Sequence, residues 1–103
     1  DRVTLDVTGD SGRVTALAHK TRGCLLTQAA ASVVARRAPG ADAASLRALH
    51  QQIEALLHGE PVADAPPEVA MFRPVQAVKS RHDCVLLPFK ALEEALAKLE
   101  AKG

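Results

Sequence analysis

The sequence predicts an α+β fold in which an N-terminal antiparallel β-hairpin, a small sheet, packs against about four helices. Apolar and polar residues alternate only within residues 2–20, whereas apolar residues recur at helical spacing from residue 24 onward. The predicted order is therefore β-β-α-α-α-α, with strands and helices segregated along the chain. Its 103 residues suit one small domain, residues 1–103.

Two strands are predicted, over residues 2–8 and 13–20, joined by a turn at residues 9–12. The turn contains two glycines, which adopt positive φ angles without strain. The positions expected to share an apolar face are Val3, Leu5 and Val7 in the first strand, and Val14, Ala16 and Ala18 in the second. Because an isolated hairpin is only marginally stable, this one must lie against the helices.

The predicted helices cover residues 24–37, 42–58, 67–78 and 85–102. The second has the clearest apolar stripe, formed by Leu46, Leu49, Ile53, Leu56 and Leu57. Asp42 is expected to cap its N-terminus. In the third helix, Val69, Phe72 and either Val75 or Ala77 are expected to face inward. Residues 79–83 are expected to be irregular, and Pro88 to lie in the first turn of the last helix, where its missing N–H is harmless.

Composition and charge disfavour several classes of function. The net charge of +1 lacks the basic excess of a nucleic-acid-binding protein, and no apolar run approaches the roughly 20 residues that span a membrane. No secretory signal is visible and there are two cysteines, so we expect reduced thiols in a cytoplasmic protein. The chain begins at Asp1 rather than at Met, and we expect further residues upstream.

The two cysteines are the main chemical feature. Cys24 and Cys84 are each expected where a helix begins, and the unpaired N–H groups there favour a thiolate over a thiol. Arg22 and Arg81 are expected to act in the same direction. Thiolates are both nucleophiles and metal ligands, so the pair predicts a metal or reactive-thiol site. The alternatives are two small buried side chains or a disulfide bond.

His82 and Asp83 precede Cys84 directly, and either could add a nitrogen or oxygen ligand to a thiolate-bound metal. A solvated loop is the plainer interpretation of each residue alone. His82 pairs only loosely with Cys84 as a base for a nucleophile, because residues two apart on a loop seldom reach hydrogen-bond geometry. The other histidines, His19, His50 and His58, are expected on exposed faces or at helix ends and are assigned no role.

Three segments together resemble the IscU/SufU/NifU N-terminal family of iron–sulfur cluster assembly proteins. Residues 1–5, Asp-Arg-Val-Thr-Leu, are similar to the family's C-G-D-x-V/I-x-L segment, with Asp1 as its Asp. Residues 20–24, Lys-Thr-Arg-Gly-Cys, resemble its K-T-x-G-C segment. Residues 80–92 are similar to the SufU-type S/A-R-x-x-C-A-x-L-x-W-x-A-L ending, with Phe89 in place of Trp. The segments occur in the family's order and cover nearly the whole chain.

The SufU-type subgroup is the most similar. Cys24 and Cys84 stand 60 positions apart, a spacing longer than in IscU, and residues 59–70 would hold the insertion that SufU-type proteins carry. Asp83 occupies the position that is His in IscU and commonly Lys in SufU. Asp83 departs from both subgroups, and it is the cysteine spacing and the ending at residues 80–92 that place this chain nearer to SufU than to IscU.

The resemblance implies a site of three cysteines and one aspartate. In this chain Asp1, Cys24 and Cys84 would be metal ligands, with Arg81, His82 and Asp83 as neighbours or additional ligands. The first family cysteine would fall two residues before Asp1, and either it precedes this chain or the protein lacks it. Such a site would hold Zn²⁺ or a transient iron–sulfur cluster.

The implied function is iron–sulfur cluster assembly, with a cysteine desulfurase and apo iron–sulfur acceptor proteins as partners and neither nucleic acid nor membrane involved. The protein would be a scaffold rather than an enzyme, or, if SufU-like, a zinc-dependent sulfur acceptor. The alternative is a diverged IscU-like binding module without metal or sulfur-transfer activity. Composition alone would support only an alanine-rich helical protein with two incidental cysteines.

Overall fold

A computed structural model describes residues 1–102 and has the expected α+β architecture. In chain order the elements are β1 (Arg2–Asp10), β2 (Arg13–Arg22), α1 (Leu25–Arg37), α2 (Ala43–Leu57), α3 (Pro67–Ala70), the 3-10 helices η1 (Arg73–Ala77) and η2 (Lys79–Arg81), and α4 (His82–Lys102). The strands form a two-stranded antiparallel sheet. Within residues 1–102, no helix is both long and apolar enough to cross a membrane.

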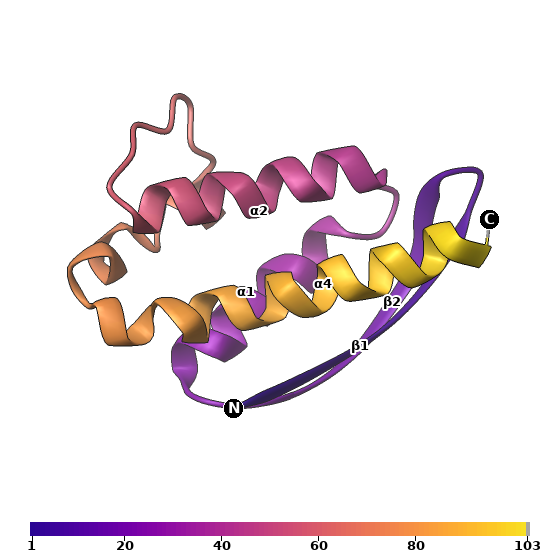
Figure 1. Cartoon of the computed structure of the whole chain (residues 1–103), viewed down its shortest axis with the longest axis horizontal. Helices are drawn as coiled ribbons and strands as arrows, with labels where there is room; N and C mark the ends of the chain where they lie inside the picture. The colour runs from indigo at the N-terminus through magenta and orange to yellow at the C-terminus, as the bar shows by residue number, and fades with distance from the viewer. Residues whose placement is uncertain (103) are drawn as a thin grey trace.

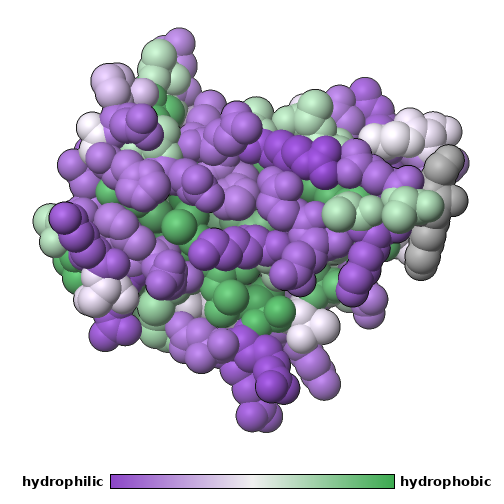
Figure 2. All heavy atoms as spheres, in the orientation of Figure 1, coloured by the Kyte–Doolittle hydropathy of each residue, from purple (hydrophilic) through white to green (hydrophobic). Residues whose placement is uncertain are grey.

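The elements form three layers, with the long helix α4 in the middle (Figure 1). The hairpin lies along one side, where β1 contacts α4 and β2 contacts α1. Helices α1 and α4 pack against each other, and α2 covers α4 on the side away from the hairpin. Figure 2 shows that the face carrying α2 and α4 is mainly hydrophilic, with hydrophobic atoms visible in patches between polar side chains. On this face, polar side chains therefore cover most of the apolar ones.

The hairpin is longer and more sharply turned than predicted. Strand pairing continues to Asp10 and Arg13, so the turn consists of Ser11 and Gly12, with φ angles of 55° and 80°. Two successive positive φ angles are typical of the tight turns whose twist matches that of a hairpin. The predicted four-residue turn at 9–12 is therefore wrong in extent, although its position is right.

The predicted inward face of the second strand is also wrong. Val14 is buried, but Ala16 and Ala18 are exposed, and Leu17 packs against the core instead. The physical reason is a β-bulge, because the register shifts between Thr8 and Gly9 and places one extra residue in β2. An extra residue reverses the side on which every following side chain points.

The helical core agrees closely with the apolar stripes of the sequence. All five predicted residues of the α2 stripe are buried: Leu46, Leu49, Ile53, Leu56 and Leu57. Asp42 caps α2 as expected, since its Oδ1 accepts a hydrogen bond of 2.8 Å from the N–H of Ser45. In α1, Ala30 and Ala31 are buried, and such small side chains allow a neighbouring helix to approach closely.

The predicted helix over 67–78 is broken into α3 and η1. Pro74 is the cause, because an interior proline removes one helical hydrogen bond and its ring clashes with the preceding turn. The inward residues are nevertheless as predicted, with Val69, Phe72 and Val75 buried. Ala77, the alternative to Val75, is exposed.

Helix α4 begins at His82, three residues earlier than predicted, and η2 precedes it directly. Residues 79–83 are therefore helical rather than irregular, and Cys84 lies inside the first turn of α4. Pro88 consequently lies in the interior of α4 and not in its first turn. Its missing N–H affects one carbonyl of the helix, that of Cys84.

His50 is not on an exposed face, which corrects the prediction. Its side chain is only 12% exposed because it lies between α2 and α4, where its ring stacks on Phe89 with the centroids 5.7 Å apart. Its Nδ1 lies 3.2 Å from Glu93 Oε1, within hydrogen-bonding geometry. Its Nε2 is 2.9 Å from Glu54 Oε1, an ion-pair distance that does not satisfy hydrogen-bond geometry. Together with Arg47, whose guanidinium contacts Glu93 and Glu100, His50 joins α2 to α4.

We predict that Phe89→Ala lowers the free energy of unfolding by about 3–5 kcal/mol, the usual cost of truncating a fully buried phenylalanine. Phe89 has no exposed surface and belongs to the helix on which every other layer packs. Leu25→Ala is the matched control, since Leu25 is 80% exposed and should change stability by no more than about 0.5 kcal/mol. Urea unfolding measures both, and equal effects of the two substitutions would contradict this core assignment.

Candidate metal centre

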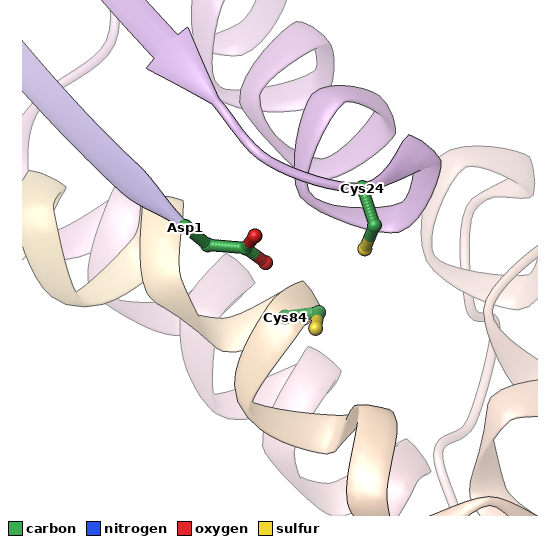
Figure 3. A group of neighbouring side chains, drawn as sticks. All are labelled: Asp1, Cys24 and Cys84. Atoms are coloured by element: carbon green, nitrogen blue, oxygen red, sulfur yellow. The ribbon is translucent and has the colours of Figure 1, made fainter.

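Three side chains from distant parts of the sequence meet at one place in the fold. Asp1 directly precedes β1, Cys24 lies between β2 and α1, and Cys84 is in the first turn of α4. One carboxylate oxygen of Asp1 and the two Sγ atoms all lie within 4.8 Å of one another. Figure 3 shows the three side chains pointing into the same space. Within residues 1–102 this is the one group of three or more His, Cys, Asp or Glu side chains close enough to share a metal ion.

The hairpin register brings Asp1 to this place. Arg2 pairs with Arg22, so the residue before β1 lies beside the residue after β2. That residue is Gly23, and a Cβ atom there would lie 2.9 Å from Asp1 Cγ and 3.0 Å from Thr27 Cβ. Such contacts are too short for carbon atoms, so the absence of a side chain at Gly23 is what lets Asp1 approach α1.

Cys24 occupies the N-cap position of α1. The pKa of its thiol is lowered from 9.0 to about 7, first by the backbone N–H of Thr27, then by the Thr27 hydroxyl, with smaller contributions from Cys84 and the N–H of Leu26; burial opposes them. The two backbone N–H groups belong to the first turn of α1, which has no acceptors of its own for them. The predicted effect of the helix start is confirmed. Arg22 and Arg81 are not among the causes of the shift.

The predicted neighbours of Cys84 lie outside the ligand group. His82 Nε2 is 3.1 Å from the carbonyl oxygens of both Val75 and Gln76, so the imidazole is engaged with η1. Asp83 and Arg81 are exposed, and neither belongs to the group. The structure thus brings together Asp1, Cys24 and Cys84, but none of the three additional candidates.

Thr27 is a site residue that the sequence analysis missed. It is fully buried, and its hydroxyl oxygen lies 3.0 Å from Asp1 Oδ2, 3.0 Å from the Cys84 carbonyl oxygen and 3.7 Å from Cys24 Sγ. It touches all three members of the group. The available signal was its position three residues after Cys24, on the helix face that also carries Ala30, because a polar residue in an apolar stripe needs a polar partner.

Positive charge surrounds the Asp1 side of the centre. Arg2, Lys20 and Arg22 line a surface hollow together with two threonines, and Asp1 is the one acidic residue of its lining. Arg2 and Arg22 are directly opposite each other in the hairpin, a placement of like charges that does not favour strand pairing. This environment favours anionic species at the Asp1 end of the centre.

The donor set fits a metal ion. Both cysteines are free thiols, so the alternative of a disulfide is not realised. Both are half-buried beside a carboxylate, which also sets them apart from cysteines that merely fill a core. Two thiolates and one carboxylate are ligands that Zn²⁺ and thiolate-held iron accept, and they leave at least one tetrahedral position for another ligand.

Comparison of the sequence and the structure with known proteins finds relatives that are named as iron–sulfur cluster assembly or NifU-like proteins. No family model matches the sequence. A curated relative, the iron–sulfur cluster assembly scaffold protein IscU of Thermotoga maritima, is 27% identical over 100 residues, which cover 96% of this chain and 70% of that protein.

Two solved structures are similar over nearly the whole chain. The N-terminal part of a NifU-like protein from Brucella abortus has a TM-score of 0.85 and 33% identity, covering 98% of this chain and 72% of that one. A protein described as an iron–sulfur cluster assembly scaffold for the SUF system, from Fervidobacterium islandicum, has a TM-score of 0.83 and 25% identity, covering 91% of this chain and 70% of that one.

We predict that Cys24 of the metal-free protein reacts with iodoacetamide with a pH midpoint of about 7. The thiolate is the reactive form, so the rate should rise as pH increases through that value and level off above it. The Cys84→Ser variant isolates Cys24, and the same variant unfolded in urea supplies the control, with a midpoint near the ordinary value of 9.0. Identical midpoints in the folded and unfolded variant would contradict the effect of the helix start.

Proposed function

Because the chain belongs to the IscU/SufU/NifU N-terminal family of iron–sulfur cluster assembly proteins, we propose that it is a cluster assembly scaffold whose metal ligands include Asp1, Cys24 and Cys84. The observation that carries this proposal is the convergence of these three side chains within 4.8 Å. They come from three separate parts of the chain, and the fold that unites them is shared with a protein described as a cluster assembly scaffold. A diverged module without metal chemistry would have no need of this convergence.

The ligand chemistry suits temporary holding of a cluster. Thiolates are soft ligands that bind iron and zinc tightly, and a carboxylate is a harder and more exchangeable ligand for the same ions. An iron–sulfur cluster on this protein is cargo, so its ligands must also allow it to leave. Cys24 and Cys84 would hold the metal, while Asp1, which is exposed, would be the ligand most easily displaced by a recipient protein's thiol.

The positive hollow beside Asp1 supports the same proposal. A cluster held by thiolates carries net negative charge, and Arg2, Lys20 and Arg22 line the hollow to which Asp1 also belongs. These cations would offset the charge that builds up as thiolates and sulfide collect at one place. The sulfur would come from a cysteine desulfurase, and apo iron–sulfur proteins would receive the cluster.

A second mechanism within the same function is direct acceptance of sulfur. The lowered pKa of Cys24, about 7, favours it, since much of this half-buried thiol would be thiolate at neutral pH. A thiolate of this chain would attack the terminal sulfur of a desulfurase persulfide. A new S–S bond forms as the persulfide S–S bond breaks, and the desulfurase cysteine leaves as a thiolate. In this case the resident metal would be Zn²⁺, and the attacking cysteine would first be released from it.

We predict that Cys24→Ser and Cys84→Ser each abolish stoichiometric metal binding, and that Asp1→Ala weakens it. Zinc and iron are measured by elemental analysis on protein purified without chelator, and acid-labile sulfide is measured after anaerobic reconstitution with iron and sulfide. Iron with sulfide supports the scaffold, and zinc alone supports the sulfur acceptor. Asp6→Ala is the matched control, because Asp6 is an exposed hairpin acid outside the ligand group.

Retention of wild-type metal content by both cysteine variants would refute the metal centre. Absence of metal from the wild-type protein, with both thiols freely reactive, would favour the diverged binding module instead. Added metal should also raise the urea concentration at which half of the wild-type protein is unfolded, but not that of the cysteine variants. A ligand that binds the folded state and not the unfolded state stabilises the protein.

We also predict that Gly23→Ala lowers metal affinity. The new Cβ would meet Asp1 Cγ at 2.9 Å and would push the carboxylate away from the two sulfur atoms. The double variant Gly23→Ala/Asp1→Ala tests this route, because Gly23→Ala should add little once Asp1 is gone. Titration with Zn²⁺ against a competing chelator measures the affinities of the two single variants and the double variant. If Gly23→Ala lowered Zn²⁺ affinity as much in the Asp1→Ala background as in the wild type, Gly23 would not act through Asp1.

A further inference from the structure

The carbonyl group of Cys84 lacks the usual hydrogen-bond donor of an α-helix. In α4 it would accept a hydrogen bond from the N–H of residue 88, four positions later, but that residue is Pro88. Proline has no N–H, and its ring also crowds the carbonyl four residues before it. One of the proposed metal ligands therefore belongs to a residue whose backbone oxygen is free to accept a hydrogen bond from a neighbouring element.

That partner is the hydroxyl group of Thr27, on α1. Its oxygen lies 3.0 Å from the Cys84 carbonyl oxygen, and the side chain is fully buried among protein atoms. The same oxygen lies 3.0 Å from Asp1 Oδ2. Pro88 and Thr27 are thus linked, because the proline leaves a free acceptor at the position where the buried hydroxyl is placed.

A threonine hydroxyl has one proton to donate, and two acceptors compete for it here. Both the Asp1 carboxylate and the Cys84 carbonyl can only accept. The hydroxyl can bond well to one of them at a time, and the other is left weakly bonded. Because a carboxylate has two oxygens, one could serve a cation at the centre while Oδ2 keeps the hydrogen bond from Thr27, which would orient the carboxylate as a ligand.

From this geometry we propose that Thr27 is a positioning residue of the metal centre. Its hydroxyl, which also serves the Cys84 carbonyl that Pro88 leaves without its helical donor, holds the Asp1 carboxylate against the first turn of α4. The proposal rests on the metal centre of the proposed function. Ligand-orienting residues of this kind set how tightly and with what geometry a metal is bound, although they do not touch the metal.

The test compares Thr27→Val, which keeps the shape of the side chain without the hydroxyl, with Thr27→Ser, which keeps the hydroxyl. Thr27→Val should bind Zn²⁺ about 10–100-fold more weakly in chelator competition, the usual effect of losing such a partner. It should also change the visible absorption spectrum of the Co²⁺-loaded protein, which reports ligand geometry. Thr27→Ser should restore both. Ser32→Ala is the matched control, since the Ser32 hydroxyl, on the exposed side of the same helix, bonds only to the Gln28 carbonyl at 3.0 Å.

A second pair of variants separates positioning from folding. Pro88→Ala restores an N–H that can serve the Cys84 carbonyl. In that background, Thr27→Val should cost less stability than in the wild type, while its loss of Zn²⁺ affinity persists. This design keeps the proposal testable even where Thr27→Val alone folds poorly.

The outcomes distinguish this proposal from the function on which it rests. Wild-type affinity and an unchanged Co²⁺ spectrum in Thr27→Val, with a wild-type protein that binds metal, would overturn the role of Thr27 and leave the metal centre intact. A loss of affinity that vanishes in the Pro88→Ala background would likewise reduce Thr27 to a structural residue. A wild-type protein that binds no Co²⁺ or Zn²⁺ would overturn both proposals together.

Discussion

The packing of α4 against both α1 and β1 is the constraint on which the rest of the structure depends. Its buried face, which includes Val85, Phe89, Leu92 and Leu96, determines where its first turn comes to lie. Cys84 is in that turn, so the apolar contacts along the helix place its sulfur beside the start of α1. The hairpin, held against the same two helices, then brings Asp1 to the same point. The candidate centre is thus formed by core packing rather than by a local loop.

Fold and ligands were predictable from sequence to different degrees. The strands, the α2 stripe and the Asp42 cap follow from periodicity and local hydrogen bonding, which act within a few residues. The inward face of β2 did not follow, because the bulge depends on pairing with β1. The location of His50 depends in the same way on α4, which is far away in sequence. Local patterns predict elements well, but they do not reveal which side of an element a distant partner will cover.

The same distinction applies to the site. The two cysteines were identifiable because thiols are rare in this chain and both were placed at helix starts. Thr27 carries no such signal, since one threonine among several is ordinary and its partners lie 26 and 57 positions away. The causes that lower the pKa of the Cys24 thiol were also only partly predictable. The helix start acts as expected, but the hydroxyl of Thr27 contributes where arginines had been expected.

The central claim is that the thiolates of Cys84, in α4, and Cys24, at the start of α1, share one metal ion with the side-chain carboxylate of Asp1. Zinc K-edge X-ray absorption of the zinc-loaded protein tests it most directly, because the spectrum reports ligand type and distance. The account predicts at least two sulfur ligands at about 2.3 Å together with at least one lighter ligand at about 2.0–2.2 Å. A first shell made only of nitrogen and oxygen would contradict it, since zinc would then be bound without Cys24 and Cys84.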